Sequence, residues 1–143
     1  MTIHQLSIFI ENRSGTLVKV LQVLKQAQIQ IIASTIADTA EYGIYRLICS
    51  EPARAYEELQ KAGVAVAQSD VVALELDNKP GRAADAIDAF SKANISIAYM
   101  YTFLLAGRGI LIFRTDNAEE AHSVILSNGL KYITEQDLMS LAE

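Results

Sequence analysis

Two short segments of the chain combine residue types that could hold a small zwitterion. The first reads Ile10-Glu-Asn-Arg-Ser-Gly-Thr-Leu17, and the second reads Leu76-Asp-Asn-Lys-Pro-Gly-Arg-Ala83. Each has an asparagine, a basic residue and a glycine in the same order. An asparagine amide offers both a hydrogen-bond donor and an acceptor, which suits a ligand carrying an ammonium and a carboxylate. If a helix follows each glycine, its free N–H groups and its positive dipole end also favour a carboxylate.

The same residues also fit a purely structural role. Asn12 and Asn78 could form Asx turns that cap the following helix. Gly15 and Gly81 could serve only the dihedral angles of the turn, although their lack of a side chain would also let a ligand approach the backbone. Both interpretations remain open from the sequence.

The two segments belong to an internal repeat, because Asn78 lies 66 residues after Asn12 and the whole chain aligns with itself at that shift without a gap. Turn glycines and apolar helix positions agree in one register, which chance pairing does not produce. The identical pairs are Asn12 with Asn78, Gly15 with Gly81, Ala27 with Ala93, Ile29 with Ile95, Ile31 with Ile97, Gly43 with Gly109, Ile44 with Ile110, Ala55 with Ala121, and Gly63 with Gly129.

The first half of each repeat has the pattern strand, helix, hairpin. Loose alternation and β-forming residues predict an opening strand, and apolar residues at helical spacing then predict a helix of roughly four turns that ends near Gln28 or Asn94. Two strands follow, joined by short turns at 38–42 and 106–109. The predicted strands are 5–10, 29–36 and 44–49 in the first repeat, and 71–76, 95–103 and 110–115 in the second.

The second half of each repeat predicts another helix and a last strand. Pro52 suits the first turn of one helix, and Asn117 suits the cap of its counterpart. Gly63 and Gly129 stand where the ends of these helices are expected. Short strands at 64–68 and 130–134 complete the repeats, and an extra helix is expected over 135–142.

This order predicts an α+β fold of two ferredoxin-like βαββαβ units, each an antiparallel four-stranded sheet with both helices on one face. The expected domains are residues 1–68 and residues 69–143, the second ending in the short extra helix. The other face of the sheet is also partly apolar, because one parity of the predicted strand 29–36 carries Ile29, Ile31 and Ala33 and the other carries Ile32 and Ile36. A sister unit or another chain should therefore cover it. Tyr99 and Tyr101 share one parity of their strand, so they are expected to pack together on one sheet face or to line a ligand pocket.

Two segments of the chain resemble the signature of the ACT domain family. They are Asn12-Arg-Ser-Gly-Thr-Leu17 and Asn78-Lys-Pro-Gly81, together with the residues that lead into the predicted strands at Ile29 and Ile95. The resemblance covers both halves of the chain. It implies a regulatory module that binds small ligands, chiefly amino acids, where two such domains pair, with a polar residue of the second strand reaching across. The binding residues that it implies here are Asn12, Arg13, Ser14, Gly15, Thr16, Leu17 and Gln30 in the first unit, and Asn78, Lys79, Pro80, Gly81, Arg82, Ala83 and Ser96 in the second.

Composition narrows the class of protein. The 143 residues are 51% hydrophobic and carry 12 Lys and Arg against 17 Asp and Glu, with no basic cluster, so nucleic-acid binding is not expected. Cys49 is the only cysteine, and we find neither a membrane span nor a signal peptide, so we expect a cytoplasmic protein that does not bind membranes. His4 and His122 do not form a usable pair, and no catalytic constellation, metal site or cofactor motif is present.

The sequence therefore predicts a protein that is not an enzyme and senses an amino acid at its strand-to-helix loops, as a homodimer. The alternative is a regulatory subunit that binds an amino-acid biosynthetic enzyme without a ligand of its own, much as the small subunits of acetolactate synthase use similar domains. An enzyme built on a ferredoxin-like scaffold is disfavoured, because the chain offers no nucleophile, base or metal cluster.

Overall fold

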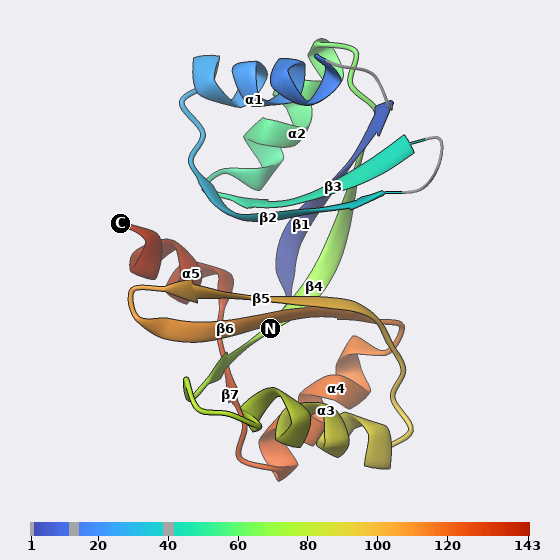
Figure 1. Ribbon diagram of the computed structural model, residues 1–143, viewed down its shortest axis with the longest axis vertical. Helices are drawn as coiled ribbons and strands as arrows, with labels where there is room; N and C mark the ends of the chain where they lie inside the picture. Colours follow the sequence, from blue (N-terminus) through green and yellow to red (C-terminus); the bar gives the residue numbers. More distant parts are fainter. Residues whose placement is uncertain (1, 12–14, 39–41) are drawn as a thin grey trace. The chain divides into compact units, whose positions relative to one another are not determined.

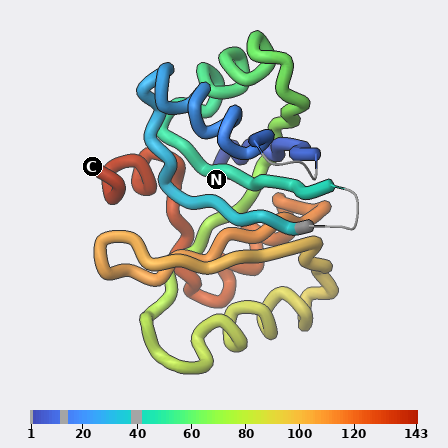
Figure 2. Tube along the Cα trace, turned by 45° about the horizontal axis from the view of Figure 1, so that its top comes forward, coloured from blue at the N-terminus to red at the C-terminus, as the bar shows by residue number. Residues whose placement is uncertain are grey.

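The computed structural model describes residues 2–11, 15–38 and 42–143. The chain divides into two compact units, an N-terminal unit of His4–Ser69 and a C-terminal unit of Asp70–Glu143 together with the start of the chain. Figures 1 and 2 trace both units along the sequence.

The N-terminal unit is a βαββαβ arrangement, as predicted. Its strand order is β2-β3-β1-β4, and β3 pairs antiparallel with both β1 and β2. The helices α1 and α2 lie on one face of the sheet (Figure 1). The elements are β1 (Ile3–Glu11), α1 (Thr16–Gln26), β2 (Ile31–Asp38), β3 (Tyr42–Cys49), α2 (Pro52–Lys61) and the first part of β4 (Val66–Leu76).

The C-terminal unit repeats this arrangement. The rest of β4 pairs antiparallel with β6 and β7, and β6 pairs antiparallel with β5. The helices α3 and α4 share one face of this sheet (Figure 1). The remaining elements are α3 (Arg82–Lys92), β5 (Ile97–Leu105), β6 (Arg108–Thr115), α4 (Ala118–Ser127), β7 (Lys131–Tyr132) and α5 (Glu135–Ala142). The predicted fold class is confirmed.

Each unit has its own hydrophobic core between the helices and one face of the sheet. In the C-terminal unit Phe90 of α3 and Phe113 of β6 are fully buried, with ring centroids 4.8 Å apart. The first core consists of Leu6, Ile8, Ile10, Val20, Leu24, Ile29, Tyr45, Leu47, Cys49, Ala55 and Leu59. The second consists of Val72, Leu74, Ala86, Phe90, Ile95, Leu111, Phe113, Ala121 and Ile125.

Several local sequence signals act as predicted. Pro52 opens α2, and the Asn117 side chain caps α4 by accepting a 3.0 Å hydrogen bond from the Glu120 N–H. Gly63 and Gly129 follow the ends of α2 and α4 with φ of 79° and 64°, a conformation that glycine adopts without strain. The extra helix is α5, which has a capping box between Thr134 and Asp137.

The predicted element boundaries need three corrections. First, α1 and α3 end at Gln26 and Lys92 rather than near Gln28 and Asn94. The later pair of residues has φ of 57° and 60°, and left-handed residues end an α-helix. The following residues, Ile29 and Ile95, donate backbone hydrogen bonds back into the last turn, so β2 and β5 begin later than expected.

The second correction concerns the middle of the chain, where strands at 64–68 and 71–76 were expected. The structure has one continuous strand, β4, and no glycine or proline interrupts the sequence there. The third correction concerns the last strand, which is only Lys131–Tyr132 instead of 130–134. The predicted turn at 38–42 falls partly on residues outside the described ones, whereas Ala106 and Gly107 form the turn between β5 and β6.

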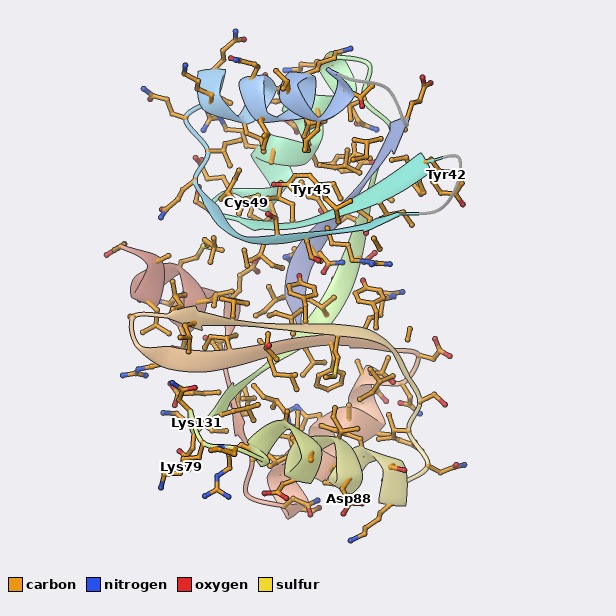
Figure 3. All side chains as sticks on the ribbon, in the orientation of Figure 1. Tyr42, Tyr45, Cys49, Lys79, Asp88 and Lys131 are labelled. Atoms are coloured by element: carbon orange, nitrogen blue, oxygen red, sulfur yellow. The ribbon has the colours of Figure 1, made fainter. Side chains whose placement is uncertain are left out.

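The outer part of the C-terminal sheet carries an ionic cluster. The Glu75 carboxylate, whose side chain is 14% exposed, contacts Arg108 at 2.9 Å and Lys131 at 2.5 Å. The hydrogen bond from Lys131 is the main cause that lowers the pKa of Glu75, and the one from Arg108 acts in the same direction against the effect of burial. At the equivalent positions of the N-terminal unit Phe9 and Tyr42 form an aromatic contact with centroids 6.5 Å apart. Figure 3 labels Tyr42 and Lys131.

Among the described residues no helix is both long enough and apolar enough to cross a membrane.

Tyr99 and Tyr101 lie on the sheet face that points away from α3 and α4. The register pairs Tyr101 with Ile112, and the neighbours of Ile112 in β6, Leu111 and Phe113, point into the core beneath the helices.

Replacement of a core aromatic residue tests the helix-on-sheet core. Phe90→Ala should lower the free energy of unfolding by about 3–5 kcal/mol, because it removes a fully buried ring and leaves a cavity. Leu126→Ala on α4 is the matched control, since Leu126 is 60% exposed and its loss should cost less than about 0.5 kcal/mol. Denaturant unfolding followed by circular dichroism measures both. Equal losses for the two variants would contradict the assigned core.

The ionic cluster predicts a pH dependence of stability. The folded-state pKa of Glu75 lies below its usual value of 4.5. Its contribution to the free energy of unfolding is therefore complete above pH 4.5 and is lost as the pH falls through the folded-state pKa. Melting temperatures of wild type and Glu75→Gln should therefore differ near neutral pH and converge in acid. Glu57→Gln, on the exposed side of α2, is the control. A difference for Glu75→Gln that does not change with pH would refute this linkage.

Candidate functional site

The strand-to-helix loop of the C-terminal unit runs from the end of β4 at Leu76 to the start of α3 at Arg82. Gly81 has φ of 87°, and apart from Gly81 itself and its two chain neighbours no atom of the described residues lies within 4 Å of the position that its Cβ would occupy. Among the described residues no side chain caps α3, and the Arg82 N–H donates a 3.4 Å hydrogen bond to the Lys79 carbonyl. A backbone turn rather than a side chain therefore precedes the first helical turn, and the loop leaves space beside Gly81.

The loop carries a compact set of charges. Arg82 Nε lies 3.4 Å from Asp77 Oδ2, and Arg82 Nη1 lies 3.5 Å from Asp85 Oδ2. The Asp77 and Arg82 side chains are 66% and 43% exposed. Ion pairs with this exposure contribute little to stability, so their partners can be exchanged.

A row of three residues explains why a cavity forms beside the loop. Gly109 at the start of β6 pairs with Leu76 of β4 on one side and with Leu104 of β5 on the other. Leu76 packs against the core beneath the helices, and directly opposed residues share a sheet face. Since Gly109 has no side chain, a gap remains between the two leucines.

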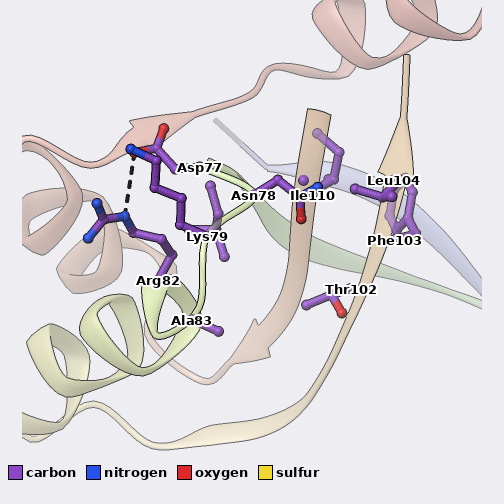
Figure 4. Close-up of a pocket in the computed structure, with 11 residues that line it drawn as sticks. Asp77, Asn78, Lys79, Arg82, Ala83, Thr102, Phe103, Leu104 and Ile110 are labelled. Carbon is purple, nitrogen blue, oxygen red and sulfur yellow. Dashed lines mark ion pairs between the residues drawn. The ribbon is translucent and has the colours of Figure 1, made fainter. Parts of the chain in front are cut away.

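The resulting pocket has a volume of about 260 Å³ (Figure 4). One side is charged and comes from the loop, and the other is largely apolar and comes from the ends of β5 and β6. Its lining residues are Leu76, Asp77, Asn78, Lys79, Arg82, Ala83, Thr102, Phe103, Leu104, Gly109 and Ile110.

The pocket brings together part of the predicted site. Four predicted residues line it, namely Asn78, Lys79, Arg82 and Ala83. Pro80 and Gly81 lie in the loop but are not among the lining residues, and Ser96 is exposed beyond the far end of α3.

The equivalent loop of the N-terminal unit is only partly described. The predicted residues Asn12, Arg13 and Ser14 lie outside the described residues. Gly15 precedes α1 with φ of 97°, and the Thr16 hydroxyl donates a 2.9 Å hydrogen bond to the Glu11 carbonyl.

The other two predicted residues of the N-terminal unit take different roles. Leu17 is half-buried and packs against the first core. Gln30 lies beyond the far end of α1, where its backbone N–H donates to the Ser50 hydroxyl at 3.0 Å and its carbonyl accepts from the Ser50 N–H at 3.0 Å. Gln30 is therefore far from Thr16, which lies at the opposite end of α1. Thr16 lines a separate cavity of about 260 Å³ together with Glu11, Lys19 and Gly63.

The structure bears on the capping alternative for Asn78. The residue at the cap of α3 is Gly81, and no side chain makes a cap hydrogen bond there. The Asn78 side chain is exposed toward the pocket rim, and it makes no hydrogen bond among the residues that the structure describes. The amide is therefore not committed to holding the helix.

Sequence reasoning missed Asp77 and the whole hairpin wall. Asp77 adjoins Asn78 in the motif, and its charge was a usable signal. Leu104 was harder to find, because it approaches the loop only through the pairing of β5 with β6 and of β6 with β4. An apolar residue on the exposed parity of β5, just before the turn, was the one local sign.

Within the described ranges no group of three or more His, Cys, Asp or Glu side chains is placed to hold a metal ion.

Comparisons with known proteins agree with this geometry. A family model described as an ACT domain pair matches residues 1–142. A Bacteroides thetaiotaomicron protein of known crystal structure is 34% identical, with 97% of this chain and 96% of that chain covered and a TM-score of 0.92. No curated protein sequence matches significantly.

Two more distant crystal structures share the fold. The regulatory subunit of aspartate kinase from Thermus thermophilus is 18% identical, with 87% of this chain and 91% of that chain covered and a TM-score of 0.63. The same subunit from Thermus flavus is 16% identical, with 100% and 95% covered and a TM-score of 0.59. Because the family model spans nearly the whole sequence, the chain belongs to the ACT domain pair family.

Proposed function

We propose that the protein is an amino-acid sensor without catalytic activity of its own, with a ligand site in the pocket of the C-terminal unit. The observation that supports this is the pocket itself, which joins Asn78, Lys79 and Arg82 of the predicted motif to an apolar hairpin wall. Charged groups at one end and apolar groups at the other match the two parts of an amino acid. The volume of about 260 Å³ suits a small metabolite rather than a large cofactor.

The bound amino acid would act by shifting the equilibrium between monomer and homodimer. A ligand changes an equilibrium only if it binds one state better than the other. The edge strand β5 exposes Met100 at 45% and Leu104 at 62%, and an exposed apolar edge favours pairing with another chain. We therefore propose a homodimer in the cytoplasm whose stability depends on the bound amino acid.

A second candidate is a regulatory subunit of an amino-acid biosynthetic enzyme such as acetolactate synthase. The exposed contact of Phe9 with Tyr42 favours it, because these rings are 48% and 44% exposed and aromatic residues are enriched at protein interfaces. Co-purification of one enzyme in fixed stoichiometry supports this candidate, and a homogeneous homodimer counts against it.

Thermal melting of the full chain with each of the twenty amino acids tests the sensor proposal. A ligand present at one hundred times its dissociation constant should stabilise the protein by about 2.7 kcal/mol. Asn78→Ala should reduce this stabilisation, whereas Gln22→Ala on the exposed side of α1 should leave it unchanged. If none of the twenty stabilises the wild type, the proposal fails.

Light scattering with Met100→Lys tests the proposed dimer. A charge at this exposed position on β5 should oppose edge pairing while leaving the fold intact, so the wild type should be a dimer and the variant a monomer. Lys131 and the cluster around it lie at the other edge of the sheet, and Ser127→Lys on α4 serves as the charge control. A monomeric wild type, or a variant that stays dimeric, would refute pairing through β5.

A further inference from the structure

We propose that Asp77 and Arg82 together read the head group of the ligand, Asp77 its ammonium and Arg82 its carboxylate, and that Leu104 selects an uncharged apolar side chain. This inference rests on the proposed function, because it assigns the chemical class of amino acid to the same pocket. Neither Asp77 nor Leu104 is among the binding residues predicted from the sequence.

The two charges of the Asp77–Arg82 ion pair match the two charges of an amino acid. Asp77 Oδ2 and Arg82 Nε are 3.4 Å apart, and both residues line the pocket. Figure 4 draws this pair across the loop. An α-amino acid carries the same two charges on one carbon atom. It can therefore open the pair and satisfy both partners, its ammonium donating to Asp77 and its carboxylate accepting from the guanidinium, with no change in net charge.

Arg82 stands at an electrostatically unfavourable position. Arg82 is the first residue of α3, so its positive charge stands at the positive end of the helix dipole, where cations are disfavoured. Its two contacts, with Asp77 and Asp85, are long at 3.4 and 3.5 Å and are largely exposed to solvent. A carboxylate in the pocket supplies a third anionic partner that also benefits from the helix end.

A row of apolar residues lies where the side chain of the ligand would be placed. Leu76, Gly109 and Leu104 form one row across the sheet, and the missing side chain of Gly109 leaves an apolar slot between the two leucines. In the N-terminal unit the corresponding row is Ile10, Gly43 and Asp38. The two rows therefore differ in sequence at one position, with Leu104 in the C-terminal row and Asp38 in the N-terminal row. A charged ligand side chain placed against the two leucines would find no charged partner within this row, whereas an apolar one would bury its surface there.

The test uses L-leucine and two analogues, leucic acid, which has a hydroxyl in place of the ammonium, and isoamylamine, which lacks the carboxylate. Calorimetric titration of the full chain should show leucine binding at least tenfold more tightly than either analogue, since each lacks one charge-assisted hydrogen bond. Glutamate and lysine serve as charged probes and should bind more weakly than leucine.

Two variants separate the roles of the ion pair. Asp77→Asn should weaken leucine about tenfold while leaving leucic acid within about twofold, because only leucine has the ammonium. Arg82→Gln should weaken leucine and leucic acid together and spare isoamylamine. Asp88→Asn and Lys92→Gln are matched controls, since these residues form a 2.9 Å ion pair at the other end of the same helix. Figure 3 labels Asp88 on α3.

A third variant tests the apolar slot. Leu104→Asp introduces the residue type of the N-terminal row at a position that is 62% exposed, so the fold should tolerate it. Leucine binding should fall about tenfold or more, and alanine binding should change less.

The outcomes separate this inference from the proposed function. Equal weakening of leucine and leucic acid by Asp77→Asn would mean that Asp77 only shapes the loop, and the head-group assignment would be wrong. Binding of glutamate or lysine in preference to leucine would keep the sensor and overturn the apolar class. Failure of all twenty amino acids to stabilise the protein would remove the proposed function itself.

Discussion

A Cβ atom on Gly109 would lie 3.1 Å from the carbonyl oxygen of Leu76, which is tighter than ordinary side-chain contacts, so glycine lets the start of β6 pair closely with the end of β4. This close pairing holds the β5–β6 hairpin beside the loop that leads into α3. It also leaves the row from Leu76 to Leu104 without a middle side chain. The charged loop and the apolar hairpin therefore meet beside Gly109, and residues of both line the pocket there. Gly43 occupies the matching position of the N-terminal unit, opposite Ile10.

Local patterns in the sequence were sufficient for the fold class but for only four of the eleven residues that line the pocket. Helical spacing, the cap at Asn117 and the turn glycines act within a few residues, so each could be predicted without knowing the rest of the chain. Asn78 and Arg82 were found for the same reason. Leu104 was not, because its distance from the loop is set by two strand pairings, and no periodicity encodes them. The continuous strand β4 was missed for the opposite reason, since a separation between repeats was expected where Ser69 and Asp70 provide no turn.

The two copies keep one backbone plan and differ in surface chemistry. Where the C-terminal unit has the ionic contact of Glu75 with Arg108, the N-terminal unit has the aromatic contact of Phe9 with Tyr42. The loop preceding each first helix differs as well, with Arg82 in one copy and Thr16 in the other. Duplication thus preserved the residues that shape turns and cores, and it left the exposed positions next to the loops to diverge.

The continuous strand β4 has a consequence for the history of the chain. Its first residues complete the N-terminal unit and its last residues open the C-terminal unit, so the chain has no separate linker at the junction of the two copies. Insertions there would interrupt a ladder of backbone hydrogen bonds rather than lengthen a loop. Recombination that exchanges one copy for an unrelated domain would break the same strand. The continuous strand therefore couples the two copies mechanically, whereas the hairpin turns and helix termini can vary without breaking it.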